Sequence, residues 1–270
     1  MVTRPTPFLS IITVNLDDRD GLARTLASIA SQSLDDRELI VVDGGSTDGS
    51  VELIRASGAL ATEWISERDR GVYDAQNKGL ARARGTYVLF LNSGDALAAP
   101  DALERLLTGP PEEAVVYGDA LIAHDDGHRE PWTFPDHLTF DYLMEETLPH
   151  PATAIRRSLF ERLGPYDVSL RIAADYELFL KAIVMEGVST RHVRYPIAVH
   201  AAGGTSWTDP AAAAAERRKV QERTLTPVLL EHWEHHVRAT RPLLWRVRSP
   251  FRPLATRVRS WSRGIRGRPG

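Results

Sequence analysis

Three continuous apolar segments constrain the fold of this chain more than any other feature. They are residues 9–14 (LSIITV), 38–42 (ELIVV) and 87–91 (YVLFL). A strand with one solvent-exposed face alternates apolar and polar residues. Continuous apolar runs are instead typical of parallel strands that are buried on both faces. Helical patterns separate the runs: Leu22, Leu26 and Ile29 share one helix face, and residues 72–84 form a helical stretch ended by Gly85. This alternation predicts a wound α/β sheet, mainly parallel and flanked by helices.

The pattern loosens after Pro100. Residues 115–117 and 152–155 read as strands, 174–186 as a helix, and 189–195 and 197–201 as two strands, whereas 120–149 looks irregular. Asp209 and Pro210 then open an Ala-rich helix, with Asp as the cap and Pro at the first helical position. We therefore expect a first domain over residues 1–208 and a helical C-terminal extension over 209–270.

Composition excludes several kinds of site and location. The chain has 270 residues and no cysteine, which rules out disulfides, thiolate nucleophiles and cysteine-ligated metals. No apolar run approaches the roughly 20 residues that span a bilayer, and no signal-peptide pattern precedes the first strand. These features predict a cytoplasmic protein, either free or peripheral on the inner face of the plasma membrane.

The charge of the chain is unevenly distributed. The net charge is -3, yet the segment from Arg238 to Gly270 carries ten arginines and no Asp or Glu. Within it, Leu254, Val258, Trp261 and Ile265 fall on one helix face. A basic amphipathic segment with aromatic anchors is typical of helices that lie on anionic membranes, so we expect residues 239–270 to bind such a surface. A helix packed on the acidic body of the chain, or a disordered tail, remains an alternative, and no nucleic-acid partner is expected because no docking module is recognisable.

Polar residues follow each of the three apolar runs. The first ends at Asn15, the second at Asp43-Gly-Gly-Ser-Thr-Asp48, and the third at Asn92-Ser-Gly-Asp95. Such residues also favour turns, but ligands of open α/β sheets bind beyond the carboxyl ends of the strands. The chain has no G-x-G-x-x-G after its first strand and no Walker loop, so a carboxylate-held Mg²⁺ or Mn²⁺ is the natural partner for phosphates, and Asp95 suits it.

These three motifs, in this order, resemble glycosyltransferase family 2. Residues 69–79 (DRGVYDAQNKG), His150-Pro151 and residues 173–177 (AADYE) extend the resemblance over roughly residues 8–205, and they resemble a bacterial branch that builds exopolysaccharides, including colanic-acid-type fucosyltransferases. The resemblance implies the GT-A fold, a Rossmann-like nucleotide-sugar-binding domain. It also implies an enzyme that moves a hexose or deoxyhexose from a nucleoside-diphosphate sugar to an acceptor hydroxyl with inversion.

The resemblance also implies roles for individual residues. Asp175 takes the position of the general base, although a carboxylate at a helix start is also stabilised there by the helix dipole. Asp95, with His200, would hold the metal, and His150 and Tyr176 would contact the acceptor or the diphosphate. The residues implied for nucleotide and donor binding are Thr13, Asn15, Asp43, Gly45, Asp69, Asp74, Asn77, Lys78, Asn92, Ser93 and Asp95.

Two of these positions carry an open question. Asn92 stands where the family's D-x-D motif has its first acid, and an amide gives a cation no negative charge. Asp74 and Lys78 lie at i and i+4, so they also fit a surface ion pair on a helix.

The expected partners are a UDP-, GDP- or dTDP-sugar and a glycolipid or saccharide acceptor. Two alternatives remain at this point. One is a non-catalytic nucleotide-sugar-binding protein. The other is a nucleotidyltransferase, although the Gly-rich loop usual after the first strand of that class is missing.

Overall fold

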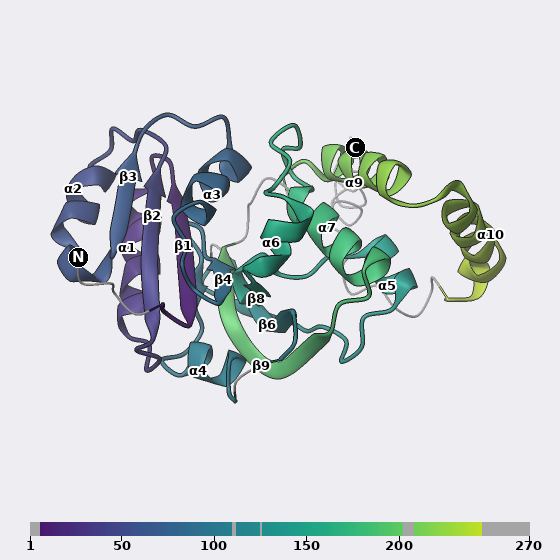
Figure 1. The fold of residues 1–270 in the computed structure, drawn as a ribbon, viewed down its shortest axis with the longest axis horizontal. Coiled ribbons are helices and arrows are strands. Elements are labelled where there is room, and N and C mark those ends of the chain that lie inside the picture. The colour runs from purple at the N-terminus through teal and green to yellow at the C-terminus, as the bar shows by residue number, and fades with distance from the viewer. Residues whose placement is uncertain (1–5, 110–111, 125, 202–207, 245–270) are drawn as a thin grey trace, which may run out of the picture. The chain divides into compact units, whose positions relative to one another are not determined.

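The structure is a computed structural model that describes residues 6–109, 112–124, 126–201 and 208–244 (Figure 1). The chain divides into two compact units, Met1–Leu225 and Thr226–Gly270. The first contains the sheet and all of the expected site residues. Within the described residues, no helix has the length and hydropathy needed to cross a membrane.

One nine-stranded sheet organises the first unit, in the order β3-β2-β1-β4-β8-β6-β9-β5, with β7 paired to β6. The strands are β1 (Leu9–Asn15), β2 (Arg37–Asp43), β3 (Glu63–Ser66), β4 (Tyr87–Phe90), β5 (Ala96–Leu97), β6 (Val115–Ala123), β7 (Arg129–Trp132), β8 (Thr153–Arg156) and β9 (Thr190–Ala201). The predicted α/β sheet is confirmed.

Helices connect and flank these strands. They are α1 (Arg19–Ala30), α2 (Ser50–Ala56), α3 (Val72–Leu80), α4 (Ala102–Leu106), α5 (Phe140–Glu145), α6 (Ser158–Leu163), α7 (Ala174–Phe179), α9 (Pro210–Thr224) and, in the second unit, α10 (Pro227–Leu244). Short 3-10 turns cover Gly58–Leu60 and His150–Ala152, and α7 continues as a π-helix over Leu180–Met185.

The parallel half of the sheet is the half that the apolar runs predict. Strands β3, β2, β1 and β4 run parallel to one another, and every residue of β1 and β4 is buried. The register pairs Asn15 with Asp43 at the ends of β1 and β2. The carboxyl ends of the parallel strands therefore meet at one edge, which places the first two polar motifs side by side.

The other half of the sheet is mixed. Strand β8 runs antiparallel to both β4 and β6, whereas β9 runs parallel to β6. The expected pair of strands at 189–195 and 197–201 is a single strand, β9. Its register against β6 shifts beside Pro196, where proline has no N–H for the ladder. The region 120–149, expected to be irregular, holds the end of β6, strand β7 and helix α5, because pairing with a distant strand overrides weak local signals.

Helix α3 is shorter than its periodicity predicts and ends at Leu80 rather than Arg84. The buried carboxylate of Glu38 explains this difference. It accepts the backbone N–H of Arg84 at 2.7 Å and two guanidinium hydrogen bonds, at 3.1 and 2.7 Å, so Arg84 leaves the helix to reach it. Burial raises the pKa of Glu38, but hydrogen bonds from Ser10 and Arg84 outweigh it and hold the pKa below its usual value.

The first compact unit extends beyond the expected boundary at residue 208. Helix α9 begins as predicted, with the Asp209 side chain accepting from the N–H of Ala212 at 3.0 Å and Pro210 in the first turn. It packs against α7, and Val220 is fully buried, so α9 belongs to the body of the first unit. The expected basic helix over residues 254–265 lies outside the described residues.

Candidate active site

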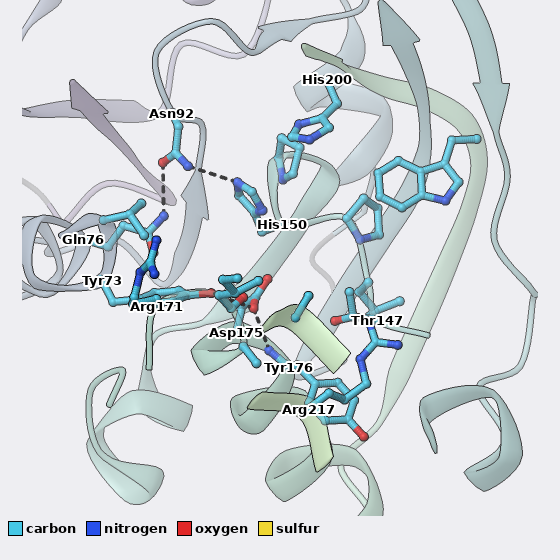
Figure 2. A pocket seen from close by; sticks show the side chains of 18 residues that line it. Tyr73, Gln76, Asn92, Thr147, His150, Arg171, Asp175, Tyr176, His200 and Arg217 are labelled. Carbon is cyan, nitrogen blue, oxygen red and sulfur yellow. Dashed lines mark hydrogen bonds between the residues drawn. The ribbon is translucent and has the colours of Figure 1, made fainter. Parts of the chain in front are cut away.

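A cavity of about 260 Å³ lies beside the carboxyl end of β4 and the start of α7 (Figure 2). Residues from both halves of the sheet and from α9 form its wall. Its polar lining residues are Tyr73, Gln76, Asn92, Thr147, His150, Arg171, Asp175, Tyr176, His200 and Arg217. Five predicted site residues thus share one cavity although they are up to 108 positions apart in the chain: Asn92, His150, Asp175, Tyr176 and His200.

Asp43, the expected nucleobase ligand, lies at the center of an internal hydrogen-bond cluster. Its Oδ1 accepts from Asn15 Nδ2 at 2.9 Å and Ser46 Oγ at 2.5 Å. Its Oδ2 accepts from Ser66 Oγ at 2.7 Å and from the backbone N–H groups of Ser46 and Gly45 at 2.9 and 3.1 Å. Burial raises the pKa of Asp43, but these hydrogen bonds outweigh it and hold the pKa below its usual value. Five donors already occupy this carboxylate, so a nucleobase N–H would have to displace one of them.

Two neighbours of Asp43 have unused hydrogen-bonding capacity. Thr13 Oγ1 and Asn15 Oδ1 are buried and have no hydrogen-bond partner among the described residues. A buried polar atom without a partner is costly in a folded protein, and such atoms often mark the place of a ligand or water. These two atoms support the predicted role of Thr13 and Asn15 more directly than the contacts of Asp43 support its own.

The glycine and acids around Asp43 serve the loop geometry. Gly45 has a φ of 90°, a left-handed conformation that glycine adopts without strain, and this aims its N–H at Asp43. Asp48 accepts from the N–H groups of Arg19 and Ser50 at 2.7 and 3.0 Å, so it organises the starts of α1 and α2.

Four residues expected in the donor pocket lie outside the cavity and fasten the 67–71 loop and α3. Asp69 accepts from the N–H of Gly71 at 2.9 Å, and Asp74 pairs with Arg70 at 2.8 Å. Lys78 donates to the carbonyl of Arg68 at 2.8 Å. Both polar atoms of the Asn77 side chain bind the backbone of Tyr166, at 2.8 and 2.9 Å. These contacts are structural, and the donor-binding role of the four residues stays a prediction.

Asn92 is one member of a hydrogen-bonded chain (Figure 2). Gln76 Nε2 donates to Asn92 Oδ1 at 3.1 Å, and Asn92 Nδ2 lies 3.2 Å from His150 Nε2. Because the amide NH₂ can only donate, His150 Nε2 accepts and the ring proton sits on Nδ1. Burial lowers the pKa of His150, which agrees with a neutral ring. An amide at position 92 therefore suits this chain better than an acid would.

Asp95 and His200 form the second polar pair. Asp95 Oδ1 accepts from His200 Nδ1 at 2.8 Å and from the N–H of Ala201 at 3.2 Å. Burial lowers the pKa of His200, but the hydrogen bond and the charge of Asp95 outweigh it and raise the pKa above its usual value. The Asp95 Oδ2 atom accepts no hydrogen bond within the described part of the chain, and His150 Nε2 lies 3.9 Å from it.

The turn from Asn92 to Asp95 brings these groups together. The N–H of Asp95 donates to the carbonyl of Asn92 at 3.1 Å, and Gly94 has a φ of 91°. Ser93 contributes to the turn through its backbone N–H, which donates to the carbonyl of Val14 of β1 at 2.9 Å. The residues are turn formers, and the turn they make presents Asn92 and Asp95 at the same strand end.

Asp175 stands opposite these groups across the cavity (Figure 2). Its Oδ1 accepts from Tyr73 Oη at 2.9 Å and from the N–H of Tyr176 at 2.8 Å. Its Oδ2 has no hydrogen-bond partner among the residues that the structure describes. One oxygen is thus held in place, while the other makes no hydrogen bond within that part of the chain. Tyr176 lines the cavity, and its hydroxyl accepts from Gln221 Nε2 of α9 at 3.0 Å.

Comparison with known families identifies the family to which this chain belongs. The family described as glycosyl transferase family 2 matches residues 10–164, more than half of the chain. The chain is a member of glycosyl transferase family 2. A relative from Mycobacterium bovis, named PGL/p-HBAD biosynthesis glycosyltransferase, is 34% identical over 199 residues, covering 71% of this chain and 76% of that one. This protein is therefore a glycosyltransferase.

Solved structures share the fold of this family 2 chain. Staphylococcus aureus TarS residues 1–349, in complex with UDP-GlcNAc, align with a TM-score of 0.60 at 17% identity, covering 72% of this chain and 58% of that one. A Pyrobaculum calidifontis mannosyltransferase in complex with GDP-Man and Mn²⁺ aligns with a TM-score of 0.54 at 22% identity, covering 78% of this chain and 61% of that one. The chain thus spans less than two thirds of either structure, and the likeness confirms the GT-A fold.

Part of the cavity wall is formed by residues that lie beyond the region matching the family. Asp175, His200 and helix α9 all lie beyond residue 164. The sequence interpretation missed Gln76, Trp132, Arg171 and Arg217, which line the cavity. Gln76 could have been found, because it stands inside the 69–79 motif. Arg171 and Arg217 belong to no local motif, and only the packing of α7 and α9 brings them to the site.

Proposed function

We propose that this glycosyltransferase moves a hexose or deoxyhexose from a nucleoside-diphosphate sugar to an acceptor hydroxyl, with inversion at the sugar. The observation that carries the proposal is Asp175 at the cavity wall, whose Oδ1 is fixed by Tyr73 and Tyr176 while Oδ2 has no partner among the described residues. A carboxylate held in this way is preorganised to act as a general base.

The proposed reaction is a single displacement. The acceptor oxygen attacks the anomeric carbon, its proton passes to Asp175 Oδ2, and the bond from that carbon to the phosphate oxygen breaks. The nucleoside diphosphate leaves with the electron pair. The strand ends that carry Thr13, Asn15 and Asn92 would hold the nucleotide, consistent with ligand binding at the carboxyl ends of parallel strands.

The residues around Asp95 fit a divalent cation in this proposal. The unpaired Oδ2 of Asp95 offers an oxygen ligand, and His200, held by Asp95 through Nδ1, offers its Nε2. No group of three or more His, Cys, Asp or Glu side chains arranged for a metal occurs among the described residues. A cation with few protein ligands is the usual case for Mg²⁺ or Mn²⁺, which take further ligands from substrate phosphates and water. When bound, such a cation would offset the charge of the leaving diphosphate.

The acceptor is proposed to be a glycolipid or polysaccharide precursor. The M. bovis relative is named for PGL/p-HBAD biosynthesis. We also propose that the chain belongs to the exopolysaccharide-building branch that residues 69–79 resemble.

The donor screen that tests the proposal measures the unfolding temperature with UDP, GDP or dTDP, with and without Mn²⁺. A ligand at a hundredfold excess over its Kd stabilises the native state by about 2.7 kcal/mol. At roughly 2–4 °C per kcal/mol, the cognate nucleotide should raise the unfolding temperature by several degrees, and more with Mn²⁺.

Thr13→Val is the matched variant for this screen. It removes a buried hydroxyl without a partner and keeps the side-chain shape, so the free protein should unfold at the same temperature or higher. The nucleotide-induced shift should shrink. If no nucleotide shifts the wild type, or if donor sugar bound with metal present is never hydrolysed or transferred, the proposed transferase activity is wrong.

The basic C-terminal segment is proposed to hold the enzyme at an anionic membrane, where a lipid-linked acceptor would present its hydroxyl. Each Lys or Arg near such a surface contributes about 1 kcal/mol. The full chain should co-sediment with phosphatidylserine vesicles and be released by salt. Replacing Arg257, Arg259, Arg263 and Arg266 with Gln should abolish co-sedimentation and leave hydrolysis of a soluble donor unchanged. Equal partitioning of the two proteins would mean that the segment does not bind membranes.

A further inference from the structure

We infer that Glu216, on helix α9, is a positioning residue that holds the loop from which Asp175 emerges. The inference rests on the proposed role of Asp175 and goes beyond it, because Glu216 lies outside the region that matches the family. The Glu216 carboxylate accepts from three consecutive backbone N–H groups, those of Arg171, Ile172 and Ala173. The distances are 2.9 and 3.1 Å from Arg171, 2.8 Å from Ile172 and 3.1 Å from Ala173.

This contact fixes the backbone that leads into α7. Ala173 occupies the cap position of α7 and has no side-chain acceptor of its own, and within the first turn the Asp175 side chain accepts the N–H of Tyr176. Hydrogen bonds from N–H groups to a charged acceptor are roughly twice as strong as neutral ones. Glu216 therefore acts as a remote cap for the turn that ends two residues before Asp175.

The peptide groups of Ile172 connect this cap to the base. The Ile172 N–H is held by Glu216, and its carbonyl accepts from Tyr73 Oη at 2.7 Å. The same Tyr73 hydroxyl lies 2.9 Å from Asp175 Oδ1, so its single proton is shared between the two acceptors. Burial raises the pKa of Tyr73 well above its usual value, so the hydroxyl keeps its proton and remains a donor. A shift of residues 171–173 would thus move both the backbone before Asp175 and the hydroxyl beside it.

Helix α9 is fixed well enough to serve as a support. Gln221 is 4% exposed and donates to the carbonyl of Met144 at 2.9 Å and to Tyr176 Oη at 3.0 Å. Arg223 pairs with Asp167 at 2.8 Å and with Glu177 of α7 at 2.7 Å. Glu216 reaches the 171–173 loop from a helix that is bonded to α7 at two further points.

The test compares Glu216→Gln with Glu222→Gln, a change of the same kind on the same helix. Glu222 is more than half exposed and pairs with Arg218 at 2.7 Å, and it does not line the cavity. Loss of a hydrogen bond to a charged group should speed amide hydrogen exchange at residues 171–173 by about ten- to hundredfold in Glu216→Gln and leave it unchanged in Glu222→Gln.

Transfer kinetics, with the donor found in the nucleotide screen, separate positioning from a loss of folding. Displacing a catalytic group by about 1 Å can cost about 10²-fold in rate, so Glu216→Gln should lower kcat by 10- to 100-fold while the donor KM stays within threefold. Because Glu216 acts through Asp175, the same change in an Asp175→Asn background should cause little further loss.

Three outcomes would overturn the inference. The first is that residues 171–173 exchange at the same rate in Glu216→Gln and Glu222→Gln. The second is that Glu222→Gln lowers kcat as much as Glu216→Gln does, and the third is that the rate loss of the double variant Glu216→Gln/Asp175→Asn equals the product of the two single losses. A wild type that binds nucleotide but never transfers sugar would refute the proposed function, and the positioning of a base with it. In that case the exchange measurement still decides whether Glu216 holds the loop.

Discussion

Asp175→Asn should reduce sugar transfer by about 10²–10⁴-fold, the usual cost of removing a general base. The amide keeps the shape of the carboxylate and can still accept from Tyr73 and from the N–H of Tyr176, so the fold and the donor KM should be preserved. What is lost is the oxygen that takes the acceptor proton. Initial rates with saturating donor and a thermal unfolding curve measure both effects.

Glu161→Gln is a suitable control for Asp175→Asn. Glu161 forms an exposed i,i+4 pair with Arg157 on α6, and breaking such a pair costs little stability. Its transfer rate should equal that of the wild type. If Asp175→Asn also transfers sugar within threefold of the wild-type rate, another group removes the proton and the assignment of the base is wrong.

Asp95→Ala should abolish measurable transfer, with a loss of at least about 10²-fold, the scale reported for removing one group that stabilises developing charge. The change removes the proposed oxygen ligand of the cation and also the acceptor that holds His200 Nδ1. Mn²⁺ binding, followed by calorimetry in the presence of nucleotide, should weaken in parallel. Chelation of the wild type should reproduce the loss, and Mn²⁺ should restore it.

Asn92→Asp is the informative companion to this experiment. Added charge beside Asp95 should tighten Mn²⁺ binding, but the carboxylate would face His150 Nε2, which accepts a hydrogen bond from the amide. A carboxylate cannot donate to His150, so Nε2 would have to carry a proton and donate instead. We therefore expect Asn92→Asp to bind Mn²⁺ more tightly but to transfer sugar no faster than the wild type, because the hydrogen-bonding state of His150 is changed. Activity that survives exhaustive chelation in the wild type would show that Asp95 acts without a cation.

The sequence determined the parallel half of this fold and the place of its site. Residues 9–14, 38–42 and 87–91 are apolar on both faces, a pattern typical of strands in a parallel sheet that is covered on both sides. Once these strands are neighbours, the polar residues that follow each of them must meet at one edge. The start of α9 could also be predicted from the sequence, because Asp209 and Pro210 act within one helical turn.

Only the tertiary structure decided how the polar groups are used. The donor-binding role expected for Asn77 stays a prediction, whereas the contact that its side chain makes in the structure, with the backbone of Tyr166 89 positions away, had no signal in the sequence. Glu38 ends α3 from a neighbouring strand, and Glu216 supports Asp175 from a helix that the sequence assigned to a separate extension. Periodicity and capping are local and repeat along the chain, so one sequence reveals them. A hydrogen bond between distant residues depends on which surfaces pack together, and a single sequence carries no local signal for that choice.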